Sequence, residues 1–334
     1  MRAWQIVSNK GIDALKLADC TSPEPGPGEV KVKVRASSIN YRDLGTVRDP
    51  EARKLPYPRI PNSDAAGEVV AVGAGVTGIK PGDRVASCFF QRWVDGACSA
   101  EAMASALGGA LDGVLAEEVV LKADGVVPVP PHLSFEAAAT LPCAALTAWN
   151  ALVEAARVKA GDTVLLLGTG GVSIFALQFA TLLGARTIVT SSSDEKLERA
   201  RKLGAWQTVN YRRTPDWDRA VLDFTDGTGV DATVEVGGAG TLPQTVVATR
   251  VAGTISLIGV LSGGLIDPAQ AMRKSIKVQG IYVGSRRMFT DMNRAIAAHG
   301  MNPVIDRTFA FEDARAAYHA MQAADHFGKL VIKV

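Results

Sequence analysis

The chain has 334 residues, which is enough for two domains of about 100–200 residues each. Hydrophobic residues make up 47% and charged residues 21%, so a disordered or fibrous chain is excluded. The net charge of +2 provides no basic field, and we expect neither nucleic acid nor a membrane as a partner. The four cysteines lack CxxC spacing, which argues against a secreted disulfide framework and favours a cytoplasmic protein.

The first 121 residues have mostly the patterns of strands. Residues 29–35 alternate polar and apolar side chains with period two, as a half-buried strand does. Residues 68–73 form a second apolar run that ends in glycine. The Pro-Gly turn at 81–82 leads into a third strand.

Residues 129–282 change character and alternate between strands and helices. The continuous apolar run at 163–167 is typical of a strand covered on both faces, and apolar residues from Val172 to Leu183 then recur at helical spacing. The remaining elements expected are strands at 186–190, 230–236 and 254–259, and helices at 194–203 and 242–251. This alternation predicts a doubly wound parallel sheet.

The stretch from Thr163 to Ala185 is uncharged over 23 residues, the length of a membrane span. We expect no span there, because a glycine turn divides it into a short apolar run and an amphipathic run. The tail predicts helices near 289–298 and 312–324 and a final strand at 329–334.

A glycine loop follows the strand at 163–167 and opens a helix. It contains Gly168, Gly170, Gly171 and Val172, with Ser173 at the place of the third glycine of a GxGxxG motif. Glycines let the backbone approach a pyrophosphate, and the helix N-terminus offers free N–H groups. The strand–loop–helix context predicts a dinucleotide site.

The end of the next strand discriminates between NAD and NADP. NAD sites place an acid there, but this chain has Ser191 and Ser192, followed by Lys196. Hydroxyl groups and a lysine donate to a 2′-phosphate, which a carboxylate would repel. With Tyr211 and Arg212 after the third strand, the pattern favours NADP(H) over NAD(H).

These motifs, together with residues 68–73, 80–85 and 326–329, resemble the medium-chain dehydrogenase/reductase family over essentially the whole chain. The similarity is to its zinc-independent, quinone-oxidoreductase-like and alcohol-dehydrogenase-like branch. It implies an α/β protein with a GroES-like, β-rich catalytic domain (1–128 and 283–334) and a Rossmann domain (129–282). It also implies hydride transfer and a homodimer that pairs the edge strand near 277–283.

The zinc-ligand positions of the family are altered. Asn40 stands for the first cysteine and Ser63 for the histidine, within Asn62-Ser63-Asp64, whereas Cys143 keeps the third position. One thiol with an amide and a hydroxyl is a poor zinc donor set, so we expect no metal. Cys143 is then interpreted as a buried wall residue.

The resemblance also implies the remaining site residues. The catalytic candidates are Asn40, Tyr41, Arg42, Asp43 and Ser63. Tyr41 is interpreted either as a proton donor or as a ring stacked on the nicotinamide, and Asp43 and Asp64 as holding their neighbours in place. Further cofactor-binding candidates are Thr147, Gly237, Gly259, Val260, Val283, Gly284, Ser285, Gly328 and Lys329. Phe89, Phe90 and Trp93 are either a wall of the substrate cleft or core residues.

Three functions remain open at this point. The first is NADPH-dependent hydride transfer to an enone, a quinone or a similar conjugated carbonyl, in which donors stabilise an enolate in place of zinc. The second is a metal-free alcohol dehydrogenase or aldehyde reductase. The third is an NADPH-binding protein with little turnover.

Overall fold

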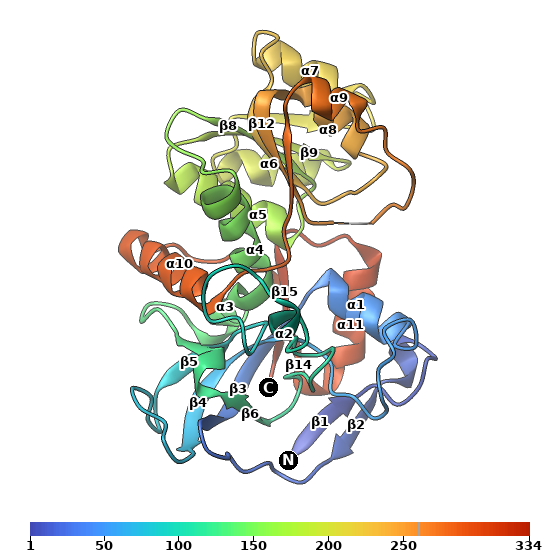
Figure 1. Ribbon diagram of the computed structural model, residues 1–334. Coiled ribbons are helices and arrows are strands. Elements are labelled where there is room, and N and C mark those ends of the chain that lie inside the picture. Colours follow the sequence, from blue (N-terminus) through green and yellow to red (C-terminus); the bar gives the residue numbers. More distant parts are fainter. Residues whose placement is uncertain (260) are drawn as a thin grey trace. The chain divides into compact units, whose positions relative to one another are not determined.

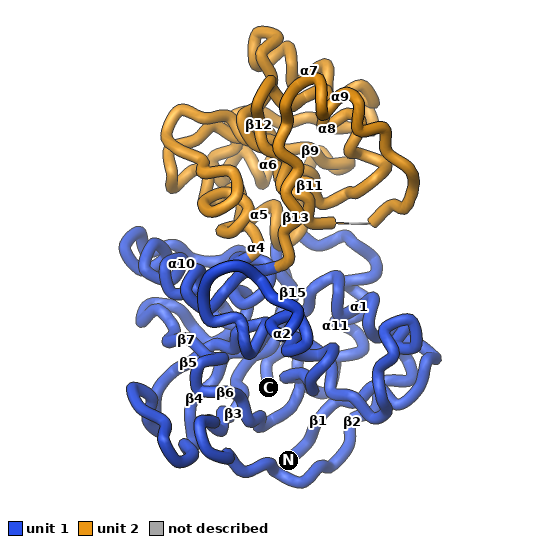
Figure 2. The backbone as a smooth tube through the Cα atoms, viewed as in Figure 1, with its two compact units in different colours: residues 1–146, 283–334 blue, residues 147–282 orange. Residues whose placement is uncertain are grey.

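The computed structural model describes residues 1–259 and 261–334, which form two compact units (Figure 2). Unit 1 comprises residues 1–146 and 283–334, and unit 2 comprises residues 147–282. The boundary predicted from sequence lay between residues 128 and 129. In the structure residues 129–146 join unit 1, where helix α3 (Phe135–Ala138) contacts the sheet.

Unit 1 is built on a largely antiparallel sheet in which both ends of the chain meet (Figure 1). Strand β3 (Glu29–Ile39) pairs with β4 (Asp64–Val72), β6 (Glu118–Lys122) and the last strand, β15 (Lys329–Lys333). The other strands of the unit are β1 (Arg2–Gln5), β2 (Lys16–Asp19), β5 (Arg84–Ser87), β7 (Val126–Pro128) and β14 (Ile305–Ala310).

Helices close the edges of this sheet. The core joins α11 (Ala314–Ala323) to β3 and β15 through Tyr318, Ile39 and Leu330. The other helical segments are α1 (Tyr41–Arg48), α2 (Ala100–Met103), α10 (Arg286–His299), η1 (Ile12–Ala14), η2 (Ala123–Gly125), η3 (Leu141–Ala145) and η5 (Phe311–Asp313). Helix α1 was not predicted, because the sequence up to residue 121 has mostly strand patterns.

Unit 2 is an all-parallel sheet of six strands in the order β10-β9-β8-β11-β12-β13. The order reverses between β8 and β11, which is the switch point where doubly wound sheets bind ligands. The strands are β8 (Thr163–Leu167), β9 (Arg186–Ser191), β10 (Gln207–Asn210), β11 (Val230–Glu235), β12 (Thr249–Leu257) and β13 (Lys277–Gly280).

Helices connect these strands. Helix α5 (Gly171–Leu182) packs on β8 and β9, and α7 (Trp217–Phe224) contacts α8 (Leu242–Ala248) over a core that includes Leu165. The others are α4 (Leu146–Trp149), η4 (Asn150–Ala155), α6 (Asp194–Lys202) and α9 (Ala269–Arg273). The sequence predicts α5, α6 and α8 but not α7 or α9. The uncharged stretch 163–185 is therefore β8, a loop and α5. No helix within 1–259 or 261–334 is long and apolar enough to span a membrane.

The predicted helix at 242–251 ends early, at Ala248. The Lys274 ammonium donates to the carbonyl oxygens of Val246, Val247 and Thr249, which satisfies the open end of α8. Thr249 already pairs with Val230 of β11, so the chain passes directly from helix into strand.

Candidate active site and coenzyme-binding residues

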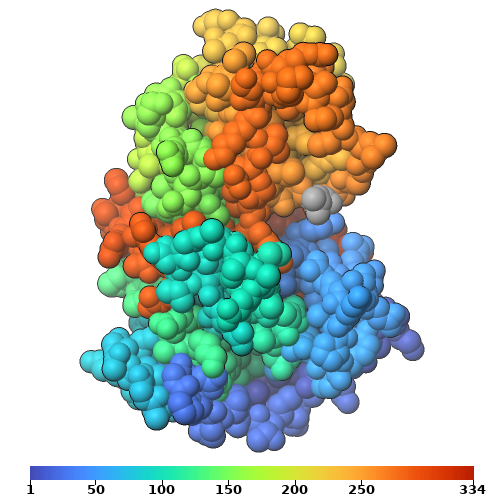
Figure 3. Space-filling view, in the orientation of Figure 1, coloured from blue at the N-terminus to red at the C-terminus, as the bar shows by residue number. Residues whose placement is uncertain are grey.

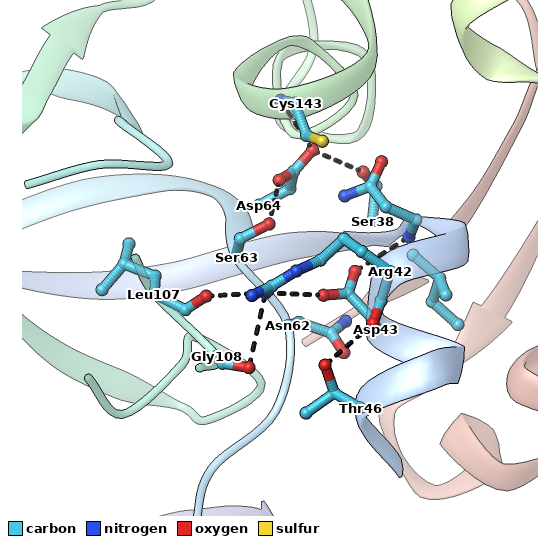
Figure 4. A network of polar contacts seen from close by, with 12 residues as sticks. Ser38, Arg42, Asp43, Thr46, Asn62, Ser63, Asp64, Leu107, Gly108 and Cys143 are labelled. Atoms are coloured by element: carbon cyan, nitrogen blue, oxygen red, sulfur yellow. Dashed lines mark hydrogen bonds and ion pairs between the residues drawn. The ribbon is translucent and has the colours of Figure 1, made fainter. Parts of the chain in front are cut away.

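A buried polar cluster surrounds the start of α1 in unit 1 (Figure 4). Asn40 precedes the helix in an extended conformation, and its backbone N–H donates to the Asp43 carboxylate at 2.9 Å. This contact is one half of a capping box, which fixes the chain where β3 turns into α1. Both side chains are buried, whereas the neighbouring Tyr41 is 55% exposed.

Arg42 points into the protein. Its Nη1 atom donates to the carbonyl oxygen of Leu107 at 2.7 Å and to Asp43 at 3.1 Å, and its guanidinium lies 4.8 Å from the Phe89 ring centroid. The guanidinium of Arg42 therefore interacts with a carbonyl oxygen, a carboxylate and an aromatic ring. Phe89, Phe90 and Trp93 are buried, so these rings are core residues.

Asp64, the first residue of β4, is completely buried and accepts three hydrogen bonds. The Ser63 hydroxyl donates at 2.6 Å, the Cys143 backbone N–H at 3.1 Å and the Ser38 hydroxyl at 3.4 Å. The carboxyl group therefore ties β3, β4 and η3 together. Next to it, Asn62 accepts from the Tyr318 hydroxyl.

Burial raises the pKa of the Asp64 carboxyl, and Asp43 raises it further. Lys329, Ser63 and Asn40 act in the opposite direction but do not outweigh burial. Burial, followed by the charge of Asp64, also raises the pKa of the Cys143 thiol well above its usual value. Cys143 is accordingly a protonated thiol at neutral pH.

Lys329 was assigned from sequence to the cofactor, and its ammonium lies beside Asn40. The side chain is 2% exposed, and Nζ donates to the Ile39 carbonyl oxygen at 2.8 Å and to Asn40 Oδ1 at 2.5 Å. The antiparallel pair Leu330–Ile39 of β15 and β3 sets this contact. The sequence lacked any local signal for it, because 289 residues separate the partners.

The three positions that correspond to zinc ligands fit a metal poorly. The Asn40 oxygen is bound to an ammonium, the Ser63 hydroxyl donates to Asp64, and the Cys143 thiol is protonated. Over the described parts of the chain, no three His, Cys, Asp or Glu side chains are grouped so as to hold a metal ion.

In unit 2 the glycine loop provides open space at the carboxyl edge of the sheet. A Cβ atom added to Gly168 or Gly170 would meet no atom within 4 Å, and Gly168 has a φ of +74°. Gly171 and Val172 begin α5, whose N-terminus has no side-chain cap. Free N–H groups beside open space fit a pyrophosphate.

The Ser191 backbone ends β9 next to the loop that follows β10. Tyr211 donates its backbone N–H to the Ser191 carbonyl oxygen at 3.1 Å, so the predicted residues after both strands are neighbours. Ser191 is buried and its hydroxyl accepts from the Ser193 N–H, whereas Ser192 and Lys196 are half-buried and Tyr211 and Arg212 are exposed.

Arg213 is a further cation beside these residues that the sequence did not single out. Its guanidinium forms an ion pair with Asp194, which also accepts from the Asn210 side chain at 2.7 Å. The first acid of α6 is therefore neutralised by its neighbours. The two consecutive arginines at 212–213 are the sequence feature from which Arg213 could have been predicted as part of this cluster.

Gly237 and Gly259 follow β11 and β12 at the same edge of the sheet. Glu235, at the end of β11, organises this turn and was also missed: its buried carboxylate accepts from the N–H groups of Gly237 (2.7 Å) and Gly238 (3.1 Å) and from two threonine hydroxyls. The sequence feature that could have pointed to Glu235 is a charged residue at the end of an otherwise apolar strand. Val260 lies outside the described residues.

The other predicted contacts are distributed between the two units. Thr147 is buried in α4 of unit 2. In unit 1, Val283 and Gly284 precede Ser285, whose hydroxyl caps α10 by accepting from the Met288 N–H at 3.2 Å. Gly328 has a φ of +87°, and a Cβ there would lie 2.5 Å from the Val304 carbonyl oxygen, so close packing itself requires glycine.

Comparisons with known proteins agree with this architecture. Residues 26–131 match the alcohol dehydrogenase GroES-like domain, and residues 171–298 match the zinc-binding dehydrogenase family model. The chain is 44% identical over 333 residues to a zinc-type alcohol dehydrogenase-like protein of Schizosaccharomyces pombe, covering 97% of this chain and 96% of that protein.

Other relatives differ in reaction and coenzyme. A quinone oxidoreductase of Pseudomonas aeruginosa is 29% identical, with 98% of each chain covered. The structure of an NAD-dependent alcohol dehydrogenase matches with a TM-score of 0.92 at 35% identity over 100% of both chains. A crotonyl-CoA carboxylase/reductase in complex with NADP matches with a TM-score of 0.89 at 25% identity, over 100% of this chain and 95% of the other.

Fold and site together define a pyridine-nucleotide-dependent oxidoreductase with a GroES-like and a Rossmann domain. The chain belongs to the medium-chain dehydrogenase/reductase family, in the branch of alcohol dehydrogenase-like and quinone oxidoreductase-like proteins.

Proposed function

We propose that this protein is a metal-free, NADPH-dependent reductase that transfers hydride to the β-carbon of a conjugated carbonyl such as an enone or a quinone. The observation that carries the proposal is the donor cluster around Asn40. At the positions where a zinc enzyme would place ligands, this chain has an amide bound to a buried ammonium and a protonated thiol. Such a cluster offers hydrogen-bond donors to an oxygen atom.

Hydride addition suits that chemistry. The bound coenzyme supplies the hydride, and the π electrons of the alkene then move onto the carbonyl oxygen to give an enolate. Hydrogen-bond donors stabilise this delocalised charge more readily than the localised charge of an alkoxide. The α-carbon finally takes a proton from water or from the Tyr41 hydroxyl, which is exposed and near Asn40 in the chain.

Carbonyl reduction is the second candidate, since the most similar relatives named above are alcohol dehydrogenase-like. Product analysis separates the two reactions. The protein is incubated with NADPH, an α,β-unsaturated aldehyde and a chelator. We expect the saturated aldehyde. An allylic alcohol would replace the proposal by metal-free aldehyde reduction, and tight NADPH binding without turnover over a carbonyl panel would indicate a binding protein.

NADPH is proposed over NADH because of the residues after β9 and β10. Gly168, Gly170 and the N-terminus of α5 would hold the pyrophosphate, while Ser191, Ser192, Lys196, Tyr211, Arg212 and Arg213 would surround the 2′-phosphate. The sequence-based assignment of Thr147, Gly237, Gly259, Val283, Gly284 and Ser285 to the nicotinamide end is retained as part of this proposal.

Replacing Ser191 with Asp places a carboxylate where the 2′-phosphate would bind. We expect S191D to lower the NADPH/NADH ratio of kcat/KM by about tenfold or more, because like charges repel. S191N is the control of equal size without the charge. If both variants change the ratio equally, bulk rather than charge is responsible and the assignment of Ser191 is wrong.

We also propose where the protein is located, what it binds and how it associates. We place the protein in the cytoplasm, with a small-molecule carbonyl compound as its substrate and neither nucleic acid nor a membrane as a partner. The four cysteines are free thiols, as a reducing compartment would keep them. We further propose a homodimer through β13, whose four residues are all exposed at the edge of the sheet (orange in Figure 3).

A further inference from the structure

The proposed function draws on the contact between Lys329 and Asn40 but gives Lys329 itself no role. Lysine is rarely buried completely, and a buried ammonium needs acceptors. Lys329 Nζ has two acceptors, the Ile39 carbonyl oxygen and Asn40 Oδ1, but it forms no ion pair with a carboxylate among the residues described. Its charge is therefore not cancelled by a direct partner.

This contact determines the orientation of the Asn40 amide. An ammonium group only donates hydrogen bonds, so the amide atom that touches it must be the oxygen. The Nδ2 group then faces away from Lys329. Asn40 is only 7% exposed, and it acts on the Asp64 carboxyl by lowering its pKa. Even so, Nδ2 makes no hydrogen bond of ordinary geometry to any described residue.

The backbone of Asn40 is held as firmly as its side chain. Its N–H donates to Asp43, and Asp43 is in turn bound to Arg42. Asn40 thus presents an oriented amide donor, backed by a positive charge, that no described acceptor satisfies in ordinary hydrogen-bond geometry. A buried donor of this kind calls for a ligand oxygen.

We propose that Lys329 is a positioning residue, which locks the Asn40 amide so that Nδ2 donates to the carbonyl oxygen of the substrate. The inference rests on the proposed function for the identity of that oxygen. Lys329 acts through Asn40: its charge strengthens the amide donor as negative charge develops on the oxygen, and it contacts neither substrate nor coenzyme.

Asn40→Asp tests the donor directly. The substitution keeps the oxygen that Lys329 binds and replaces Nδ2 by a second oxygen of nearly equal size. With 2-cyclohexen-1-one and NADPH we expect kcat to fall at least 100-fold, while the protein stays folded at the assay temperature and the Kd for NADPH stays within experimental error. S38A is the control, because Ser38 lies in the same cluster and its hydroxyl donates to Asp64 rather than to Asn40 or Lys329. Retention of kcat within threefold in N40D would overturn the proposal.

Lys329→Met tests positioning through a double-mutant cycle. We expect K329M to lower kcat at least tenfold in the wild-type background and less than twofold in the Asn40→Leu background, because its effect passes through Asn40. Equal losses in both backgrounds would assign Lys329 a merely structural role. If K329M does not fold, K329R, which keeps the charge but changes the geometry, replaces it in the same cycle.

A binding measurement separates this inference from the proposed reaction. The NADP⁺-loaded protein cannot donate hydride, so the Kd of 2-cyclohexen-1-one reports recognition alone. Binding to the wild type and at least tenfold weaker binding to N40D would support the oxygen site even if no enone were reduced. Absence of binding to the wild type, or equal binding to both proteins, would overturn it.

Discussion

The buried carboxyl group of Asp64 links a single residue to the pH dependence of stability. Its pKa in the folded protein lies above the ordinary value of 3.8, because burial disfavours the charge. Between these two values the folded state binds more protons than the unfolded state, so Asp64 makes folding less favourable as the pH rises. Each unit of raised pKa corresponds to about 1.4 kcal/mol lost across this window.

Asp64→Asn removes this titration. We expect D64N to become more stable relative to wild type as the pH rises from 4 to 8, so that the difference in the free energy of unfolding, variant minus wild type, increases. Denaturant unfolding at several pH values measures this difference.

Asp231→Asn is the matched control, because the pKa of Asp231 is shifted in the opposite direction. Burial alone would raise the pKa of Asp231, but hydrogen bonds from the Thr163 N–H and Arg250 lower it below 3.8. D231N should therefore lose stability relative to wild type as the pH rises from about 2 to 4, and the difference should stay level at higher pH. Parallel curves for the two variants would contradict this account.

At the same scale, the candidate residues that the sequence offers are close together in the chain. The family resemblance implies the run from Asn40 to Asp43, and Ser63 beside Asp64, and the structure has contacts within both runs. The partner of Asn40 could not be found in this way. It depends on the register of β15 against β3, which no local pattern encodes.

At the scale of elements, hydrophobic periodicity predicted some of the buried strands and helices but missed α7, which buries Trp217 and Val221. It predicted β8 and α5, whose residues are mostly buried. Periodicity failed at α1, where a capping box, rather than an apolar stripe, starts the helix. It also failed at the end of α8, which is determined by Lys274, more than twenty residues further along the chain.

The turn between β11 and α8 depends on Glu235. Its carboxylate accepts four hydrogen bonds, including those from the Thr241 and Thr245 hydroxyls at 2.7 and 2.5 Å. Glu235→Gln replaces one acceptor oxygen with a donor that faces other donors. We expect a loss of about 1–3 kcal/mol in the free energy of unfolding by urea, the cost of an unsatisfied buried group.

The matched control for this element is Glu198→Gln. Glu198 forms an exposed ion pair with Arg201 on α6, and such pairs contribute little, so E198Q should stay within about 0.5 kcal/mol of wild type. We also expect E235Q to weaken NADPH binding, since Gly237 belongs to the proposed nicotinamide end. A stability loss no larger than that of E198Q would mean that the turn is held without the carboxylate.

For the whole molecule, the main question is what covers the edge of the six-stranded sheet, where β13 has a neighbouring strand on one side only. Strand β13 ends the sheet, and Val278 on it is 45% exposed. The preceding segment also exposes Leu265, Ile266 and Met272. Exposed edges and apolar patches of this kind are the usual sites of association between copies, and two-fold pairing would cover them.

Val278→Lys should therefore separate the proposed homodimer into monomers, because a charge on an edge strand opposes pairing with a second copy. Light scattering coupled to size-exclusion chromatography should report about twice the mass of the 35.1 kDa chain for the wild type and one chain for V278K. Val70→Lys is the control, since Val70 is similarly exposed, at 39%, but lies on β4 of unit 1. A wild-type monomer, or a V278K dimer as stable as the V70K dimer, would show that β13 does not form the interface.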